Sequence, residues 1–83
     1  MIMKVAVKFF SHFRQIVGAD QVSVDLDSGA TIAGLLNSLS ERFDSPALKN
    51  DRAVIIVNAK NAFPETILND GDSVLVLPIL GGG

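Results

Sequence analysis

The sequence predicts an α+β domain in which one main helix packs on a mixed sheet of four to five strands. Three observations predict it. Apolar and polar residues alternate near both ends of the chain, one long segment has helical spacing, and a β-branched run follows that segment. The chain has 83 residues, the length of a single domain, and we expect residues 1–80 to form it.

The first half of the predicted sheet is a hairpin with a helical turn in its loop. Residues 2–10 alternate with period two, and residues 21–26 (QVSVDL) alternate again. Between them, residues 11–17 (SHFRQIV) are expected to form a short helical turn, with Ser11 as its N-cap and Gly18 at its C-terminal end.

The main helix is expected to begin after Thr31, which is placed to cap it. The apolar residues that follow at helical spacing are Ile32, Leu35, Leu36, Leu39 and Phe43. The helix should end before Pro46, because a residue that precedes proline resists the helical conformation.

The second half of the predicted sheet begins with residues 53–57 (AVIIV), a β-branched run typical of a strand buried on both sides or against a helix. Residues 58–61 predict a turn, and Pro64 limits the next segment to an irregular or edge position. Residues 69–72 (NDGD) predict another turn, followed by the last strand in residues 73–79. Since a crossover with a helix separates them, the first and last strands are expected to be parallel and central. This arrangement is the β-grasp, or ubiquitin-like, architecture.

Composition argues against several classes of function. The absence of Cys excludes a disulfide framework, a thiolate metal site and a thiol nucleophile. The net charge is −2 and the basic residues are scattered, so no nucleic acid is expected as a partner. No apolar run is long enough to span a bilayer, and MIMKVAVKFF alternates like a strand rather than a signal peptide. We therefore expect a cytoplasmic protein without a membrane partner.

The residue types used in catalysis are interpreted as structural. His12 is the single histidine, and with no Ser or Cys constellation to serve it is expected at the surface or at a helix end. Asp70 and Asp72 flank a glycine in a turn, where Asp is favoured for local hydrogen bonding. No metal site is predicted.

An apolar docking patch is predicted near the end of the last strand. The five phenylalanines, Phe63 included, are expected mostly in the core, but alternation places the adjacent Phe9 and Phe10 on opposite faces. One of these two should therefore meet solvent or a partner. The predicted patch consists of Phe10, Leu75, Leu77, Ile79 and Leu80.

The sequence ends in LPILGGG, and we expect residues 81–83 to form a flexible glycine tail. Without Cβ atoms, three extended residues span roughly 10 Å and enter a narrow site without steric conflict. The same glycines are also compatible with a disordered end, a cloning remnant or the stump of a longer chain.

Four stretches resemble the MoaD/ThiS-type sulfur carriers, a group that contains the small subunit of molybdopterin synthase and the carrier of the thiamine pathway. They are VAVKFFSHFRQIVGAD, LLNSLSERF, VNAKNA and LNDGDSVLVLPILGGG. The resemblance covers essentially the whole chain. Its most specific part is the spacing of the turn at residues 70–72, the last strand, Pro78 and the terminal glycines.

The resemblance implies a function carried by the backbone. In this family an E1-like adenylating enzyme uses ATP to activate the carboxylate of the last glycine, and a sulfur donor protein then converts it to a thiocarboxylate. In molybdopterin synthase the tail enters the large catalytic subunit and gives its sulfur to cyclic pyranopterin monophosphate, in molybdenum cofactor biosynthesis. The carrier itself has no active site and binds no cofactor.

Carried over to this sequence, Gly83 holds the reactive acyl group, and Gly82 and Gly81 form a slender stalk behind it. The family usually ends in two glycines, so either the third is tolerated or it is removed first and Gly82 is the acyl end. Other functions stay open: a thiamine-pathway or other thiocarboxylate carrier, a ubiquitin-like modifier joined to lysines, or an interaction domain with an inert tail. Chain length, FRQIVG after the first strand and Pro78 favour the molybdopterin type.

Overall fold

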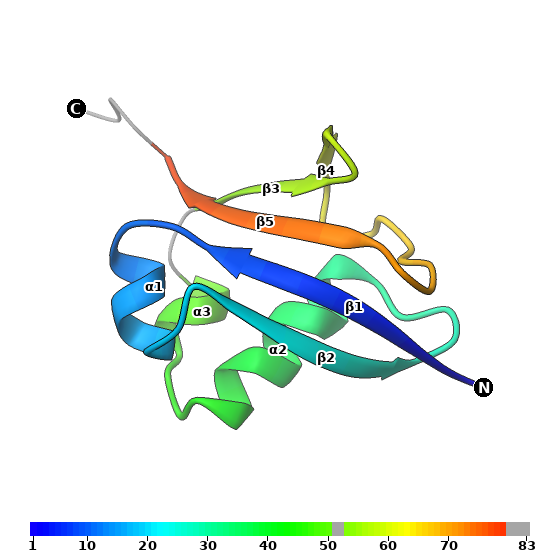
Figure 1. The fold of residues 1–83 in the computed structure, drawn as a ribbon, viewed down its shortest axis with the longest axis horizontal. Coiled ribbons are helices and arrows are strands. Elements are labelled where there is room, and N and C mark those ends of the chain that lie inside the picture. Colours follow the sequence, from blue (N-terminus) through cyan, green and yellow to red (C-terminus); the bar gives the residue numbers. More distant parts are fainter. Residues whose placement is uncertain (51–52, 80–83) are drawn as a thin grey trace.

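The computed structural model describes residues 1–50 and 53–79, which form one mixed five-stranded sheet with helices packed on it (Figure 1). The strands are β1 (Ile2–Phe9), β2 (Gln21–Asp27), β3 (Ala53–Val57), β4 (Lys60–Ala62) and β5 (Ser73–Pro78). The helices are α1 (His12–Val17), α2 (Ile32–Arg42) and α3 (Ala47–Asn50). The strand order is β2-β1-β5-β3-β4, in which β1 and β5 are parallel and the other neighbours antiparallel. This topology confirms the predicted β-grasp fold.

The hydrophobic core lies between the sheet and α2. On the central strand β1, alternate residues are buried, and on β5 the buried residues are Val74 and Val76. Helix α2 covers them with Leu35 and Leu39, which are both fully buried. Burial thus follows period two on β1 and β5 and helical spacing on α2, as the sequence pattern predicts for these elements, whereas Leu48 and Leu68 join the core from outside them.

The N-terminus of α2 is tied to the loop that leads into β5. Thr31 caps the helix as predicted, because its Oγ1 accepts a hydrogen bond from the Gly34 N–H at 3.2 Å. The Ile32 N–H donates to the carbonyl of Thr66 (3.0 Å), and the Ala33 N–H donates to the carbonyl of Pro64 (2.9 Å). These bonds satisfy helix donors that would otherwise lack partners, and they fix residues 64–66 against the helix.

Helix α1 forms where it was predicted, but Ser11 does not cap it. Ser11 has a positive φ of 54° and makes no side-chain cap hydrogen bond. The carbonyls of Phe10 and Ser11 instead accept from the N–H groups of Phe13 and Arg14. The predicted cap is therefore wrong, because an N-cap side chain needs an extended backbone to reach these donors. Gly18 ends the helix in the left-handed conformation, as predicted.

The hairpin of β3 and β4 differs from the prediction in the length of its turn. Only Asn58 and Ala59 form the turn, with positive φ values of 50° and 71°, and Lys60 already pairs with Val57. Two-residue loops with positive φ match the twist of paired strands, which allows the short strand β4 to form. The one-turn helix α3 was also not predicted.

Burial of the second half of the sheet is less complete than predicted. On β3 only Ile55 is buried, whereas Val54 is 37% exposed. Phe63, expected in the core with most of the phenylalanines, is 61% exposed because it lies in a turn after β4. Phe9 and Phe13 are fully buried. Within the described residues, no helix has the length and apolar character needed to cross a membrane.

Candidate functional site

The sheet has a second face, opposite α2, which we call the open face. On β5, Leu75 and Leu77 alternate with the buried Val74 and Val76, so their side chains belong to the open face. On β3, Val54 and Ile56 share this face, since they pair directly with Leu77 and Leu75. All four are apolar, and each is partly accessible to solvent.

Phe10 extends the apolar part of the open face onto the end of β1. Its N–H donates to the Val76 carbonyl at 3.2 Å, which continues the pairing of β1 with β5 beyond Phe9. Phe10 is half-buried, and the Lys8 Nζ lies 6.0 Å from the centre of its ring, over the ring face. As alternation predicts, Phe9 faces the core and Phe10 the opposite side.

These five residues, Val54, Ile56, Leu75, Leu77 and Phe10, form what we call the apolar patch. The structure therefore brings together three of the residues predicted to bind a partner and adds two from β3. The β3 residues were missed because a continuous β-branched run is typical of a strand without an accessible side. The pairing of β3 with β5, which places them in the patch, involves distant parts of the sequence.

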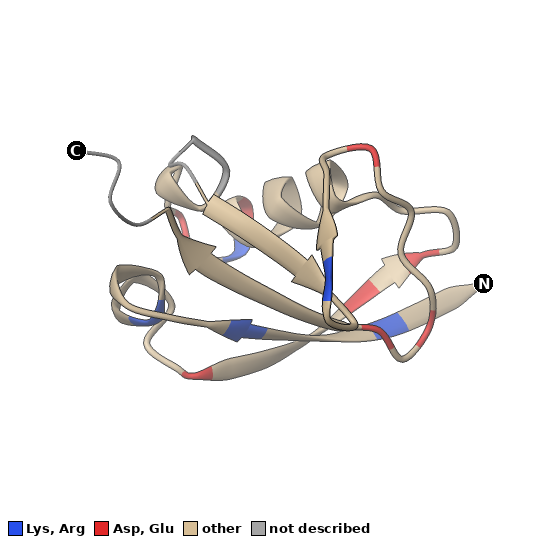
Figure 2. Cartoon of the chain, turned by 90° about the horizontal axis from the view of Figure 1, so that it is seen from above, with Lys and Arg blue, Asp and Glu red and all other residues tan. Residues whose placement is uncertain are grey.

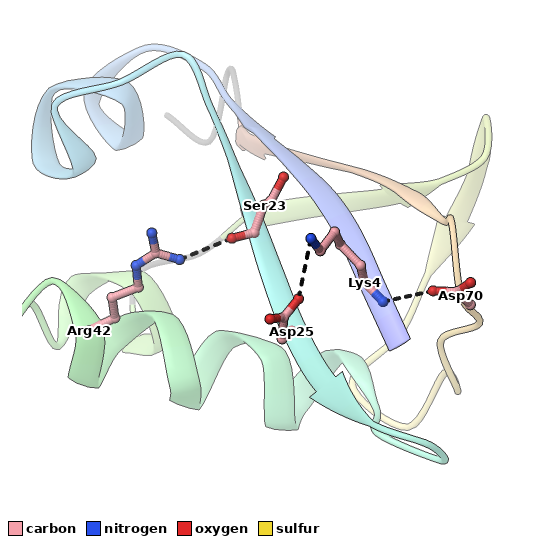
Figure 3. Close-up of polar contacts among 5 residues, drawn as sticks. All are labelled: Lys4, Ser23, Asp25, Arg42 and Asp70. Atoms are coloured by element: carbon pink, nitrogen blue, oxygen red, sulfur yellow. Dashed lines mark hydrogen bonds and ion pairs between the residues drawn. The ribbon is translucent and has the colours of Figure 1, made fainter. Parts of the chain in front are cut away.

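The opposite end of the open face is polar. There Ala6 lies between Ser23 and Ser73, and Lys4 is paired with Asp25 on β2. Figure 3 shows the Lys4 ammonium directed toward the Asp25 carboxylate, 4.0 Å away. The charged residues along the strands are spread over the sheet rather than gathered at the end of β5 (Figure 2). The apolar patch is thus confined to the end of the sheet at which β1 and β5 both terminate (Figure 1).

The turn before β5 anchors that strand to β1. The Lys4 N–H donates to Asp70 Oδ1 at 2.8 Å (Figure 3), and the Gly71 N–H donates to the Lys4 carbonyl at 2.8 Å. Asp72 is 7% exposed and accepts the Asn69 N–H at 2.8 Å. Both carboxylates thus bond to the backbone, in agreement with their structural interpretation.

The remaining predicted site residues lie at or beyond the end of the described chain. Ile79 is its last residue and is 45% exposed. The predictions for Leu80, Gly81, Gly82 and Gly83 fall outside the described residues. His12 is exposed at the start of α1, with its ring 4.1 Å from that of Phe13. In residues 1–50 and 53–79 no group of three acidic or histidine side chains could hold a metal ion.

Comparison with known proteins identifies the family. The sequence model of the ThiS family matches residues 7–83. The chain belongs to the ThiS family. Within it, the chain is 31% identical to small archaeal modifier protein 3 of Haloferax volcanii, over 98% of this chain and 100% of that one. It is 29% identical to the molybdopterin synthase sulfur carrier subunit of Drosophila ananassae, over 99% of this chain and 93% of the relative.

A solved structure supports the same assignment. The putative molybdopterin converting factor subunit 1 of Pyrococcus furiosus superposes with a TM-score of 0.81 and 30% sequence identity, covering 93% of this chain and 99% of that one. The resemblance inferred from sequence is therefore confirmed. The chain is a ubiquitin-like protein of the ThiS/MoaD sulfur-carrier type.

Proposed function

We propose that this protein is the small subunit of a molybdopterin synthase and carries sulfur as a thiocarboxylate on its C-terminal glycine. The observation that carries the proposal is the position of the apolar patch at the end of the sheet where β5 terminates. A partner that binds the patch is held next to the point from which the chain continues into the glycine run. The patch supplies affinity, and the glycines supply a strand narrow enough for an active site.

The proposed chemistry takes place on the main-chain carboxylate. A carboxylate oxygen attacks the α-phosphate of ATP on an E1-like activating enzyme, pyrophosphate leaves, and an acyl-adenylate forms. A donor protein then supplies sulfur at the oxidation level of sulfide, which attacks the carbonyl carbon, and the bond to AMP breaks so that AMP leaves. Gly83 is the proposed acyl residue, or Gly82 if the last glycine is removed first. Because activation consumes ATP, we infer a cytoplasmic location.

The large catalytic subunit is the proposed acceptor of this sulfur. Two of the relatives favour it, since one is named as a molybdopterin synthase subunit and the other as a molybdopterin converting factor subunit. In the proposed complex the large subunit binds the apolar patch and receives the tail. Cyclic pyranopterin monophosphate is bound by the large subunit and takes up the sulfur there.

Protein modification is a second candidate function. The relative at 31% identity, which this chain covers from end to end, is named a modifier protein. The same activated glycine, attacked by a lysine amine instead of sulfur, gives an isopeptide bond. Isopeptide adducts on other proteins in cells that express the chain, absent when Gly82 and Gly83 are deleted, would favour this function.

The deciding experiment is the intact mass of the protein after incubation with ATP, the activating enzyme and a sulfur donor. The expected result is a gain equal to the exchange of one oxygen for sulfur, and fragmentation assigns it to Gly83 or Gly82. The sulfurated protein, mixed with the large subunit, should then convert cyclic pyranopterin monophosphate to molybdopterin. An unchanged mass with an activating enzyme known to be competent would refute sulfur transfer.

A further inference from the structure

An exposed aromatic side chain lies outside the apolar patch and has no part in the function proposed so far. Phe63 is 61% exposed, although its backbone is firmly held. Its N–H donates to Thr66 Oγ1 and its carbonyl accepts from the Thr66 N–H, both at 2.9 Å. Pro64 follows it and stiffens the turn. The ring is therefore presented to solvent by an ordered turn.

Phe63 lines a depression of about 330 Å³ at the edge of the sheet. The lining is apolar except for one side chain and comprises Ala53, Val54, Ile55, Asn61, Ala62, Phe63 and Pro64. Aromatic residues, Phe among them, are enriched at the core of protein interfaces relative to the rest of the protein surface. The apolar lining of the depression suits an aliphatic or aromatic side chain of a partner.

The depression is continuous with the apolar patch. Val54 belongs to both, since it lines the depression and pairs with Leu77 across the open face. Phe63 directly follows β4 and lines the depression together with Val54. Phe10 lies just beyond β1, and its N–H bonds to the Val76 carbonyl, next to Leu77. We call Phe63, Val54, Leu77 and Phe10 the row.

The row is short compared with a protein interface. Three strand spacings of about 4.8 Å give about 14 Å between its two ends. A standard interface buries about 800 Å² on each partner, which corresponds to a disc about 30 Å across. A partner centred on Leu77 therefore covers Phe63 as well as Phe10.

We propose that Phe63 and its depression form a second contact with the large subunit, which places an apolar side chain in the depression. This inference rests on the proposed function, because it concerns the same partner. The large subunit is favoured because the depression shares Val54 with the apolar patch, and the proposed function assigns that patch to the large subunit.

The test compares three variants for their binding to the large subunit by titration calorimetry. Phe63→Ser should weaken binding at least about tenfold, and Phe63→Leu should retain most of the affinity because it remains apolar. Ile67→Ser is the matched control. Ile67 is 60% exposed and lies four residues further along, but it pairs with Thr31 at the start of α2, away from the row. The affinity of Ile67→Ser for the large subunit should stay within about twofold of the wild type.

A second measurement separates the two partners and the two proposals. The rate of thiocarboxylate formation by the activating enzyme should be the same for Phe63→Ser as for the wild type. Unchanged binding of Phe63→Ser to the large subunit, or an equal loss in binding and activation, would overturn this inference. If wild-type protein binds the large subunit and only Leu77→Asp abolishes binding, the inference fails while the proposed function stands. If the wild type does not bind at all, the proposed function fails first.

Discussion

The side-chain amide of Asn58 donates a hydrogen bond of 2.8 Å to the carboxylate of Asp72, which joins the β3–β4 turn to the start of β5. The same Asn58 accepts the Ser73 N–H at 3.0 Å, and its own N–H donates to the Ser73 carbonyl at 2.9 Å. Asp72 is nearly buried, and its carboxylate accepts from the Asn58 amide and from the Asn69 N–H, which replace the hydrogen bonds to water that burial removes. This network holds the base of the strand that ends at the apolar patch.

Replacement of Asn58 should destabilise the fold through this network. Asn58→Gly removes both side-chain bonds but tolerates the positive φ of 50°, and we expect it to lower the free energy of unfolding by about 1–3 kcal/mol. Asn58→Ala should cost about 1 kcal/mol more, because its Cβ disfavours that backbone conformation. Urea unfolding of the two variants measures both effects. Wild-type stability of Asn58→Gly would show that the network contributes nothing.

Two glycines should respond oppositely to alanine. Gly71 has a φ of 84° in the turn before β5, and a Cβ added there would meet nothing within 4 Å. Gly71→Ala should therefore lower the free energy of unfolding by about 1–2 kcal/mol, through backbone strain alone. Gly34 is exposed in α2 and a Cβ there would meet only Thr31 Oγ1 at 3.7 Å. Because glycine is less favourable than alanine inside a helix, Gly34→Ala should raise the free energy of unfolding by about 0.5–1 kcal/mol. Thermal unfolding measures both effects. Equal shifts of the two melting temperatures in the same direction would contradict the predicted difference between the two glycines.

The cap of α2 gives a third prediction. Thr31→Ala removes the acceptor of the Gly34 N–H and should cost about 1 kcal/mol of stability. Thr31→Ser keeps a hydroxyl in the same place and should stay within about 0.5 kcal/mol of the wild type. Denaturant unfolding distinguishes the two. If Thr31→Ser lost as much as Thr31→Ala, the methyl group rather than the hydrogen bond would be responsible.

The sequence was sufficient to predict the elements whose signals are local. Period-two alternation predicted β1 and β2, and the spacing after Thr31 predicted α2. Ser11 was misjudged because its residue type suits a cap, whereas its backbone in the connection between β1 and α1 has a positive φ rather than the extended conformation that a cap needs. Residue type alone does not determine which backbone conformation a turn takes.

The candidate site was only partly predictable for a different reason. Phe10, Leu75 and Leu77 were predicted because strand alternation and proximity to the glycine run are visible in one stretch of sequence. Val54 reaches the open face through the pairing of β3 with β5, and Phe63, just after β4, lines a depression together with Val54. That register follows from tertiary contacts, and β4 is too short for its own pattern to show.

The apolar patch gives the last prediction. Leu77→Asp places a charge between Val54 and Phe10, where binding of the large subunit would remove it from water. We expect affinity for the large subunit to fall at least about tenfold. Ser73→Asp is the matched control, because Ser73 lies four residues earlier on the same face of β5, is exposed, and neighbours Ala6 rather than the patch. Both variants add the same charge to the same strand, so a general electrostatic effect would weaken both equally. Circular dichroism checks that both variants are folded. Loss of binding in Leu77→Asp alone would then locate the interface at the end of β5. Wild-type affinity of Leu77→Asp would place the interface elsewhere on the molecule.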